Sequence, residues 1–418
     1  MLGALLSCAC LFLPVAGMRA SAADDLYARI GERLALMRDV AAWKWHNGLP
    51  IEDGERETLV LRAAVEEGLR RQIRPESSRA FFRVQMEAAK DIQRYWFGQW
   101  QRLGHPPAPV DLDSVLRPRL LVLGGEILAL LADRGPVPDR DGFLAAVRLP
   151  GLHEERAAEL FRALQAVDRY DSRLEQILDT GVLRVGTTGD YEPFSWRPTE
   201  KAEEAGDAVG SEDAAHFSGV DIDMARDLAA ALDVELKLVQ TGWPRLMNDL
   251  AAGRFDIAMS GVSRTLSRAR HAYFSVPYHV GGKTAIARCE DRRRFATLTA
   301  IDRPGVRVIV NPGGTNEAFL DGRLTRAEKV LHTDNRTIFA ALAAGAADVM
   351  ITDSIEVILQ AARNPALCGT MGTTLSYQEK AYLMPQDNEL KTFVDTWLEL
   401  RLADGTVNGL LEKHMTAR

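Results

Sequence analysis

The sequence predicts a multidomain protein in which an all-α domain is followed by an α/β domain. The chain has 418 residues, and domains of roughly 100–200 residues would divide it into two to four. Over about residues 24–170, apolar residues recur every three to four positions, which is the helical period. Over residues 171–418, short apolar runs alternate with helical segments, a pattern typical of a mostly parallel sheet covered by helices.

Composition and charge exclude several classes of protein. Hydrophobic residues make up 46% of the chain and charged residues 26%, as in ordinary globular proteins, so fibrous and disordered classes do not fit. The formal net charge of −7 provides no global basic field for a phosphate backbone, so a nucleic-acid partner is not expected. An anionic ligand would have to be bound by a few local cations.

The first 22 residues have the pattern of a signal peptide. An apolar run from Leu2 to Val15 precedes Ala20-Ser21-Ala22, a small-x-small cleavage site, although no Lys or Arg comes before the run. Cys8 is an alternative lipoprotein acceptor, but the apolar stretch before it is short. Elsewhere the sequence lacks the ~20 apolar residues of a spanning helix, so we expect a periplasmic protein that leaves the membrane after cleavage.

Helical periodicity defines each element of the first domain. Leu26, Ile30, Leu34 and Met37 begin a repeat that continues to Trp45, where Gly48-Leu49-Pro50 interrupts it. Further helices are predicted at about residues 53–71, 77–103, 111–134, 142–147 and 153–168, with a proline-rich loop at 105–109.

Cations lie where this helical domain should form its core. Arg33 and Lys44 are eleven residues apart in the first helix, which places them about 20° from eclipsed and ~16 Å apart along the axis. Both side chains could reach water with their charged ends. Later helices add Asp53, Arg56, Glu57, Gln93 and Arg117. Burying several cations away from water costs free energy unless partners of opposite charge neutralise them. These residues therefore also fit a site for a small multivalent anion.

Several motifs of this region resemble the exported, gamma-type chorismate mutases. They are Glu32-Arg33-Leu34, residues 41–45 (AAWKW), residues 49–53 (LPIED) with Arg56, and Arg117-Pro118-Arg119-Leu120. The resemblance implies an all-helical domain that rearranges chorismate to prephenate without a cofactor. It assigns the substrate carboxylates to Arg33, Arg56 and Arg117 and the breaking ether oxygen to Lys44 and Gln93, and it gives Asp53 and Glu57 the roles of orienting Lys44 and contacting the substrate hydroxyl. Arg119 remains an alternative to Arg117, and Ala89 stands where the family usually has a hydroxyl residue.

The α/β domain is predicted to alternate strands with helices. Strands are expected at residues 182–186, 235–240, 256–259, 306–310 and 348–351, and helices at 223–232, at 243–252 and after Gly313-Gly314. Residues 198–215 are rich in Glu, Asp, Ala and Gly without periodicity, so we expect a solvated loop there, with a functional lid as the alternative.

Residues 182–195 (VLRVGTTGDYEPFS) and 219–225 (GVDIDMA) resemble the solute-binding proteins for polar amino acids. That family has two α/β lobes, the second of which would span about residues 283–377 here. The resemblance assigns a ligand carboxylate to Ser263, Arg268 and Thr315, an ammonium group to Asp353, and a covering aromatic to Trp243, with Asp190 also at the site. Taken alone, Arg268 lies in an arginine-rich segment that reads as a solvated face.

A more specific resemblance is to the cyclohexadienyl dehydratases. It rests on residues 187–194, 256–261 (DIAMSG), 272–278 (AYFSVPY), 311–317 (NPGGTNE) and 379–383 (EKAYL). It implies conversion of prephenate to phenylpyruvate, and of L-arogenate to phenylalanine, with Glu356 as the acid and Asn316 assisting it. Taken alone, Asp353 and Glu356 instead read as a capping box at a helix start.

Two cysteines, Cys289 and Cys368, would remain after signal cleavage. An oxidising compartment favours a disulfide between them, with two buried thiols as the alternative. The dehydratase family has a pair at the same places.

The two resemblances together predict a bifunctional enzyme, since the product of the first domain is the substrate of the second. A non-catalytic amino-acid receptor fused to the mutase is the alternative. The eight histidines show no ligand spacing and there is no dinucleotide fingerprint, so neither a metal nor a cofactor is expected. Both families commonly assemble, which leaves a homo-oligomer open.

Overall fold

The computed structural model describes residues 22–135, 138–198 and 216–416, which form two compact units that meet in sequence between Arg169 and Tyr170. The predicted signal peptide and nearly all of the 198–215 segment lie outside the described residues. Within the described ranges, no helix combines the length and the apolar character that crossing a membrane requires.

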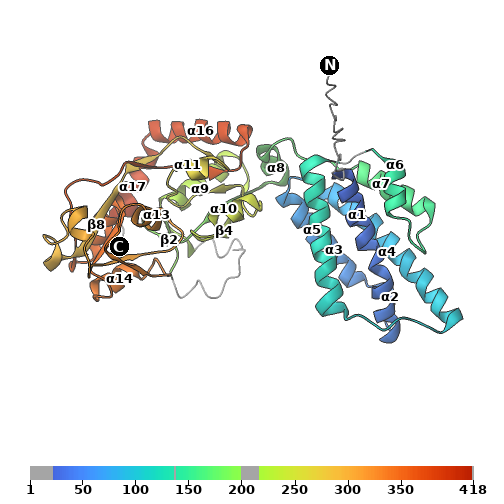
Figure 1. The fold of residues 1–418 in the computed structure, drawn as a ribbon. Helices are drawn as coiled ribbons and strands as arrows, with labels where there is room; N and C mark the ends of the chain where they lie inside the picture. The colour runs from blue at the N-terminus through green and yellow to red at the C-terminus, as the bar shows by residue number, and fades with distance from the viewer. Residues whose placement is uncertain (1–21, 136–137, 199–215, 417–418) are drawn as a thin grey trace, which may run out of the picture. The chain divides into compact units, whose positions relative to one another are not determined.

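The first unit is built of helices (Figure 1), as the sequence predicts. They are α1 (Ala22–Ala35), α2 (Met37–His46), α3 (Gly54–Arg70), α4 (Pro75–Leu103), a π-helical turn (Leu112–Leu116), α5 (Arg117–Arg134), α6 (Arg140–Ala146) and α7 (Glu154–Gln165). The predicted first helix is divided at Leu36, whose backbone stays near helical values, so α1 and α2 continue in nearly one register. One face of each long helix is apolar, and Ile30, Phe81 and Ile127 are fully buried in their shared core.

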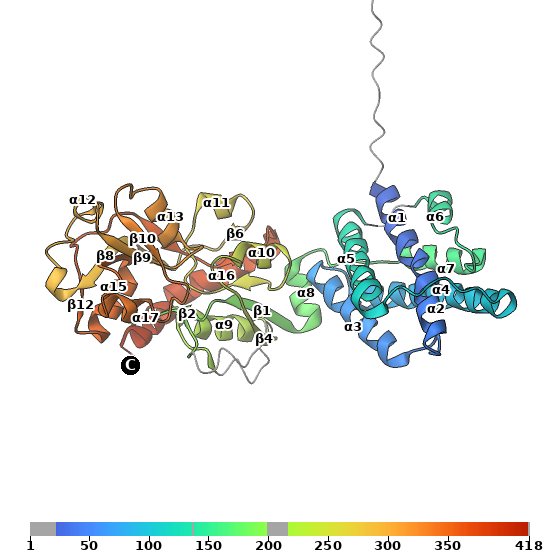
Figure 2. The same cartoon turned by 60° about the horizontal axis from the view of Figure 1, so that its bottom comes forward.

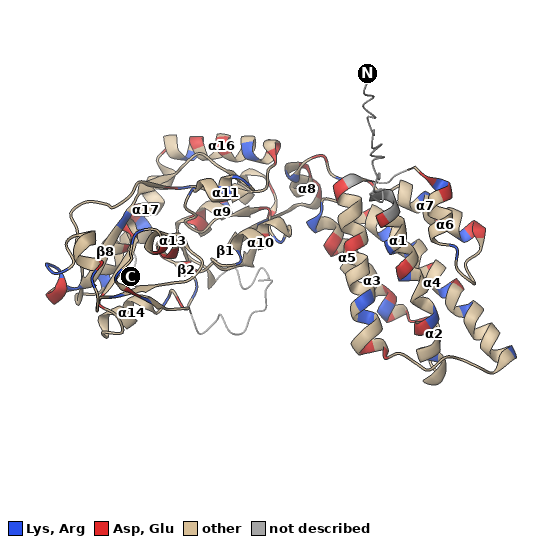
Figure 3. Cartoon of the chain, viewed as in Figure 1, with Lys and Arg blue, Asp and Glu red and all other residues tan. Residues whose placement is uncertain are grey.

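Charges of both signs alternate along these helices. In the view of Figure 3, Lys and Arg residues are interspersed with Asp and Glu residues on α1, α3 and α4. Many of them pair within or between helices, such as Arg29 with Glu32 at 2.9 Å and with Glu126 at 3.2 Å. The unit therefore shows mixed charge on the visible face rather than a basic stripe.

The second unit contains two five-stranded sheets, each with helices against it (Figures 1 and 2). Its elements in chain order are α8 (Arg173–Thr180), β1 (Val182–Thr187), β2 (Asp190–Tyr191), β3 (Ser195–Trp196), α9 (Val220–Ala231), β4 (Glu235–Gln240), α10 (Leu246–Ala251), β5 (Ile257–Ala258), α11 (Leu266–Ala269), β6 (Tyr273–Phe274), β7 (His279–Gly281), β8 (Lys283–Arg288), η4 (Cys289–Asp291), α12 (Leu298–Ile301), β9 (Arg307–Val310), α13 (Thr315–Asp321), β10 (Glu328–Leu331), α14 (Ile338–Ala343), β11 (Val349–Asp353), α15 (Ser354–Arg363), β12 (Leu367–Gly369), β13 (Gln378–Lys380), β14 (Leu383–Met384), α16 (Asn388–Ala403) and α17 (Thr406–Thr416). The five predicted strands correspond to β1, β4, β5, β9 and β11. The prediction omitted the other strands, including the six-residue β8 within the second sheet, and the helices α8, α11, α12, α14, α16 and α17.

Each sheet combines parallel and antiparallel neighbours. The first has the order β4-β1-β5-β14-β6, in which β1 is parallel to β4 and β5, and β14 is antiparallel to both its neighbours. The second has the order β10-β9-β11-β8-β12, in which β8 is antiparallel to β11 and β12. The two sheets share no strand, so each belongs to its own lobe, and the two-lobed prediction is confirmed. Strand β14 returns to the first sheet after the second is complete.

Two segments connect the lobes and pair with each other. Strand β7 leads into the second lobe and β13 leads out of it, and they form an antiparallel ribbon. At Gly282, directly after β7, a Cβ atom would lie 1.8 Å from the carbonyl oxygen of Ser376. Only glycine lets the two connections approach this closely.

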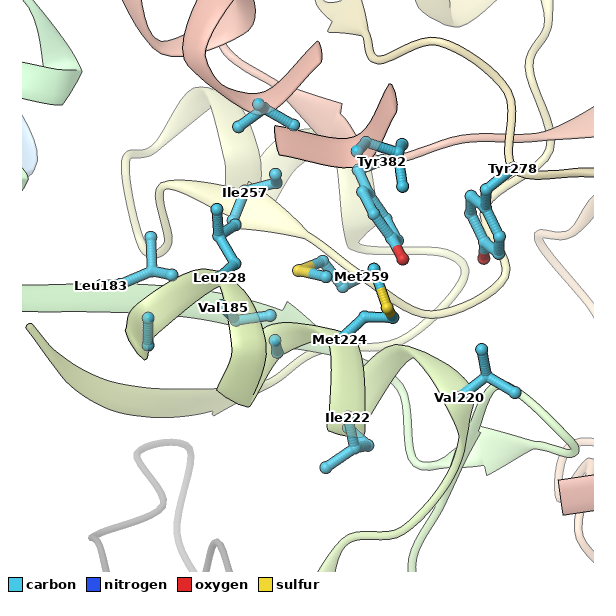
Figure 4. Packing of buried hydrophobic residues seen from close by; sticks show 14 of the residues in the cluster. Leu183, Val185, Val220, Ile222, Met224, Leu228, Ile257, Met259, Tyr278 and Tyr382 are labelled. Atoms are coloured by element: carbon cyan, nitrogen blue, oxygen red, sulfur yellow. The ribbon is translucent and has the colours of Figure 1, made fainter. Parts of the chain in front are cut away.

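The core of the first lobe lies between α9 and its sheet. Figure 4 shows Leu228 of α9 beside Leu183 and Val185 of β1 and Ile257 of β5, all of them fully buried. Complete burial of such a side chain contributes about 1.5–3 kcal/mol. In the second lobe, Cys289 and Cys368 form a disulfide between η4 and β12, which confirms the predicted pairing.

Candidate active sites

The helical unit contains a cavity of about 650 Å³ bounded by α1 to α5. Its lining includes all seven residues predicted for this domain: Arg33, Lys44, Asp53, Arg56, Glu57, Gln93 and Arg117. Arg119 is not part of the lining, and its guanidinium pairs with Glu32 instead. Of the two alternatives left open by the sequence, Arg117 is the one that the structure places at the cavity.

Arg33 is a buried cation, and among the described residues it has no acidic partner. Its Nη1 donates to Gln85 Oε1 at 2.6 Å, its guanidinium lies 5.5 Å from the Phe82 ring centroid, and its Nε has no partner in the described part of the chain. Burial lowers the pKa of Arg33 to about 10, so the guanidinium stays charged at neutral pH. A carboxylate entering the cavity would supply the missing counter-charge.

The Lys44 ammonium group contacts the segment between α2 and α3. Its Nζ donates to the carbonyl oxygen of Ile51 at 2.6 Å, whereas Asp53 caps α3 by accepting from the Arg56 N–H, and Glu57 pairs with Lys90 at 3.2 Å. Both carboxylates act on Lys44 through space, and the expectation that Asp53 and Glu57 orient it stays a prediction. Burial lowers the pKa of Lys44, and the charges of Asp53 and Glu57 oppose that shift through space.

Gln93 is buried on the cavity side of α4. Its Nε2 donates to the Ala89 carbonyl oxygen at 3.2 Å, and its Oε1 has no partner among the described residues. A half-turn of the amide exchanges its nitrogen and oxygen, so Gln93 can offer an N–H group to a ligand oxygen at any pH.

The α/β unit has a small pocket of about 20 Å³ between its lobes. It is lined by seven predicted residues, Trp243, Ser263, Arg268, Thr315, Asn316, Asp353 and Glu356, together with Tyr191, Gly261, Asn311, Gly314, Asn335 and Lys380. Asp190 does not line it, but its carboxylate accepts a hydrogen bond of 3.1 Å from the Trp243 indole. Asp190 thus holds the predicted covering aromatic.

Asp353 lies at the centre of a charge network that the sequence did not reveal. Its carboxylate contacts Lys283 Nζ and Lys380 Nζ, each at 2.7 Å, and accepts from the Tyr191 hydroxyl. Burial alone would raise the pKa of Asp353, but the two ammonium groups hold it well below its usual range. Two lysines of this chain thus already pair with the carboxylate to which the resemblance assigns a ligand ammonium, and that role of Asp353 stays a prediction.

Lys283 links this network to helix α13. Its Nζ also donates to Thr315 Oγ1 at 3.0 Å and to the Asn316 side-chain oxygen. The side chain is completely buried, and burial lowers its pKa while Asp353 opposes that shift. The sequence indicated the role of Lys283 only by placing a lysine at the start of β8, whose next four residues are small or apolar.

Glu356 lies in the first turn of α15 and is 3% exposed. Its carboxyl group contacts the Thr352 hydroxyl, and Asp353 makes no side-chain cap to the helix, so the capping-box alternative is wrong. Burial raises the pKa of Glu356 to about 8, and the neighbouring Asp353 charge adds to that shift. The group is thus a neutral acid at pH 7.

Arg268 provides a cation at the same pocket. Its Nη1 donates to the Ser263 carbonyl oxygen at 3.0 Å, and the ion pairs of the described ranges do not include it. Burial lowers the pKa of Arg268, but an arginine guanidinium ordinarily keeps its charge in proteins. The pocket therefore joins an acid to a cation suited to a carboxylate.

Residues 183–417, more than half of the chain, match the bacterial extracellular solute-binding proteins, family 3. The chain belongs to that family. Residues 23–94 match chorismate mutase type II, so this family member carries a mutase domain before its binding-protein unit.

Individual relatives cover both units. A cyclohexadienyl dehydratase of Pseudomonas aeruginosa is 46% identical over 257 residues, which are 61% of this chain and 91% of that protein. A secreted chorismate mutase of Yersinia pestis is 28% identical over 173 residues, 40% of this chain and 92% of that protein. The solved structure of an ancestral amino acid-binding protein, described as a precursor of cyclohexadienyl dehydratase, covers 59% of this chain and 100% of its own, with 30% identity and a TM-score of 0.52.

Proposed function

We propose that this family member is an exported bifunctional enzyme. Its helical unit rearranges chorismate to prephenate, and its two-lobed unit dehydrates and decarboxylates prephenate to phenylpyruvate. The observation that carries the proposal is a buried Glu356, neutral at pH 7, at the same pocket as the cation Arg268. The 46% identity to a cyclohexadienyl dehydratase and the match to chorismate mutase type II support it.

In the mutase cavity the residues act by positioning and electrostatics. Arg33, Arg56 and Arg117 hold the two carboxylates, which keeps chorismate in a compact conformer. Lys44 and Gln93 donate to the ether oxygen, where negative charge develops as the carbon–oxygen bond breaks. No covalent intermediate is required of the protein.

In the two-lobed unit Glu356 donates its proton to the ring hydroxyl of prephenate. The hydroxyl leaves as water, the bond from the ring to its carboxylate breaks, and that electron pair completes the aromatic ring as carbon dioxide departs. Arg268 and Ser263 hold the side-chain carboxylate, and Asn316, fixed by Lys283, contacts the leaving group. A pocket of about 20 Å³ is too small for prephenate, so the lobes must separate about the β7–β13 ribbon before binding.

The charge network also bears on substrate choice. An amino-acid substrate such as L-arogenate would bring its ammonium group to an Asp353 already paired with Lys283 and Lys380. We therefore propose prephenate as the preferred substrate. The same pairing disfavours the alternative of a non-catalytic amino-acid receptor.

Purified mature protein incubated with chorismate tests the proposal. The ultraviolet absorbance of phenylpyruvate should rise after a lag during which prephenate forms. Prephenate that accumulates without phenylpyruvate would favour the receptor, and unchanged chorismate would contradict the mutase assignment. A cell-fractionation assay should find the activity in the periplasm, the compartment that we propose.

A further inference from the structure

Glu356 lines two cavities rather than one. Besides the pocket between the lobes, it lines a cavity of about 250 Å³, here termed the rear cavity. The rear cavity is bounded by Asp190, Glu192, Trp196, Asn335, Arg336, Phe339, Ala340, Gln360, Arg363 and Asn364. Its volume allows several water molecules, whereas the pocket between the lobes has room for about one.

The proposed dehydratase reaction, on which this inference rests, consumes one proton per turnover. Prephenate enters with two carboxylates and leaves as phenylpyruvate with one, together with water and carbon dioxide. The proton that completes the departing water comes from Glu356, which remains as a carboxylate. A second turnover therefore requires a new proton from solvent at the same oxygen atoms.

The substrate side is a poor route for that proton. Lys380 and Arg268 are cations in the lining of that pocket, against the single anion Asp353, and its volume of about 20 Å³ leaves no room for a chain of waters once substrate is bound. Positive charge there opposes the approach of a hydronium ion.

The rear cavity has charges of both signs in its lining, with Asp190 and Glu192 facing Arg336 and Arg363. Gln360 lies one helical turn after Glu356 on α15, and the partly buried Asp190 and the buried Asn335 add polar groups to the walls. Ala340 and Arg363 are solvent-exposed members of its lining, and Arg363 pairs with Glu192 at 2.7 Å. A polar wall that runs from an exposed rim to a buried acid is suited to a short chain of waters.

We propose that the rear cavity is the route by which Glu356 regains its proton from solvent between turnovers. The substrate pocket and the proton supply then lie on different sides of one carboxyl group. Reprotonation can proceed while product still occupies the pocket between the lobes.

Two substitutions obstruct the cavity without touching the pocket between the lobes. Ala340→Phe places a ring at the exposed rim, and Gln360→Leu removes the polar wall nearest Glu356. Ala344→Phe is the matched control, because Ala344 is an exposed residue at the end of the same helix α14 and does not line the cavity.

The test is a rapid-mixing experiment with prephenate in excess over enzyme at pH 7, with phenylpyruvate followed by absorbance. In the obstructed variants the first turnover should keep its rate within about twofold, since Glu356 begins protonated, while steady turnover falls at least about tenfold. The trace should thus show a burst of one product per site. Wild type and Ala344→Phe should show no burst.

Two outcomes would overturn the inference: steady turnover unchanged in both obstructed variants, or a first turnover slowed by the same factor as later ones. If one variant fails to fold, the other decides between these outcomes. Absence of phenylpyruvate from the wild type would instead refute the dehydratase function itself, so the two failures are distinguishable.

Discussion

Glu356→Gln tests the proposed acid directly. Glutamine keeps the size of the side chain and can still contact the Thr352 hydroxyl, which touches the Glu356 carboxyl group. It has no acidic proton to give. The charge network of Asp353 with its two lysines is left in place, so binding of prephenate should change by less than about threefold while turnover is lost.

The magnitude follows from the surroundings of the carboxyl group. With a pKa of about 8, roughly nine-tenths of Glu356 is protonated at pH 7, whereas a carboxyl at the ordinary 4.5 would be roughly 0.3% protonated. Burial thus increases the available acid by about 300-fold. A general acid contributes about 10²–10⁴-fold to rate, so we expect the kcat of Glu356→Gln to fall within that range.

Steady-state assays of supplied prephenate between pH 5 and 10 would measure both effects. Because only the protonated acid is active, wild-type kcat should be constant at low pH and should decline as pH rises through about 8. The small residual rate of Glu356→Gln should lack that decline. Retention of a tenth or more of kcat by the variant, or a wild-type rate that rises through pH 8, would refute the assignment.

Three further outcomes are expected. Lys44→Ala should lower mutase turnover by at least ~10³, about 4 kcal/mol, while dehydration of supplied prephenate continues at the wild-type rate, as paired assays would show. Asp353→Asn strands two buried ammonium groups and should reduce the free energy of unfolding by about 3–5 kcal/mol in urea titrations; a loss below about 1 kcal/mol would mean that the lysines find other partners. Replacing Cys289 and Cys368 together by Ser opens a link between residues 79 apart and should cost about 2–4 kcal/mol, with reductant lowering the stability of wild type but not of the variant.

Periodicity predicted the helices of the first unit and five strands of the second, but it did not predict β8, a largely buried six-residue strand of the second sheet. The helical period of 3.6 residues and the apolar runs at β1, β9 and β11 are local properties of the sequence, so they can be recognised without knowledge of the tertiary structure. The short strands β6 and β14 were missed because a two-residue strand has no period to detect. Its pairing is decided by distant neighbours rather than by its own sequence.

The candidate sites divide in the same way. Residues such as Arg33 and Lys44 could be placed together because one helical face carries both. The partners of Asp353 could not, since Lys283 is 70 positions and Lys380 is 27 positions away in sequence. The antiparallel pairing of β8 with β11 places Lys283 opposite Asp353, and β13 brings Lys380 to the same carboxylate, each ammonium group at 2.7 Å. The raised pKa of Glu356 likewise depends on tertiary burial, which the local sequence does not show. The local pattern therefore indicated only a capping box.

Strand β14 has a consequence for how the chain is made. A polypeptide that is synthesised, or threaded through a translocon, from its N-terminus presents α1 to α7 long before Leu383 arrives. The helices of the first unit can therefore condense early through local contacts, whereas the first sheet of the second unit must wait with an open gap between β5 and β6. During that interval the edges of β5 and β6 are exposed, and truncation between residues 170 and 383 would leave a complete helical unit attached to an unfinished lobe.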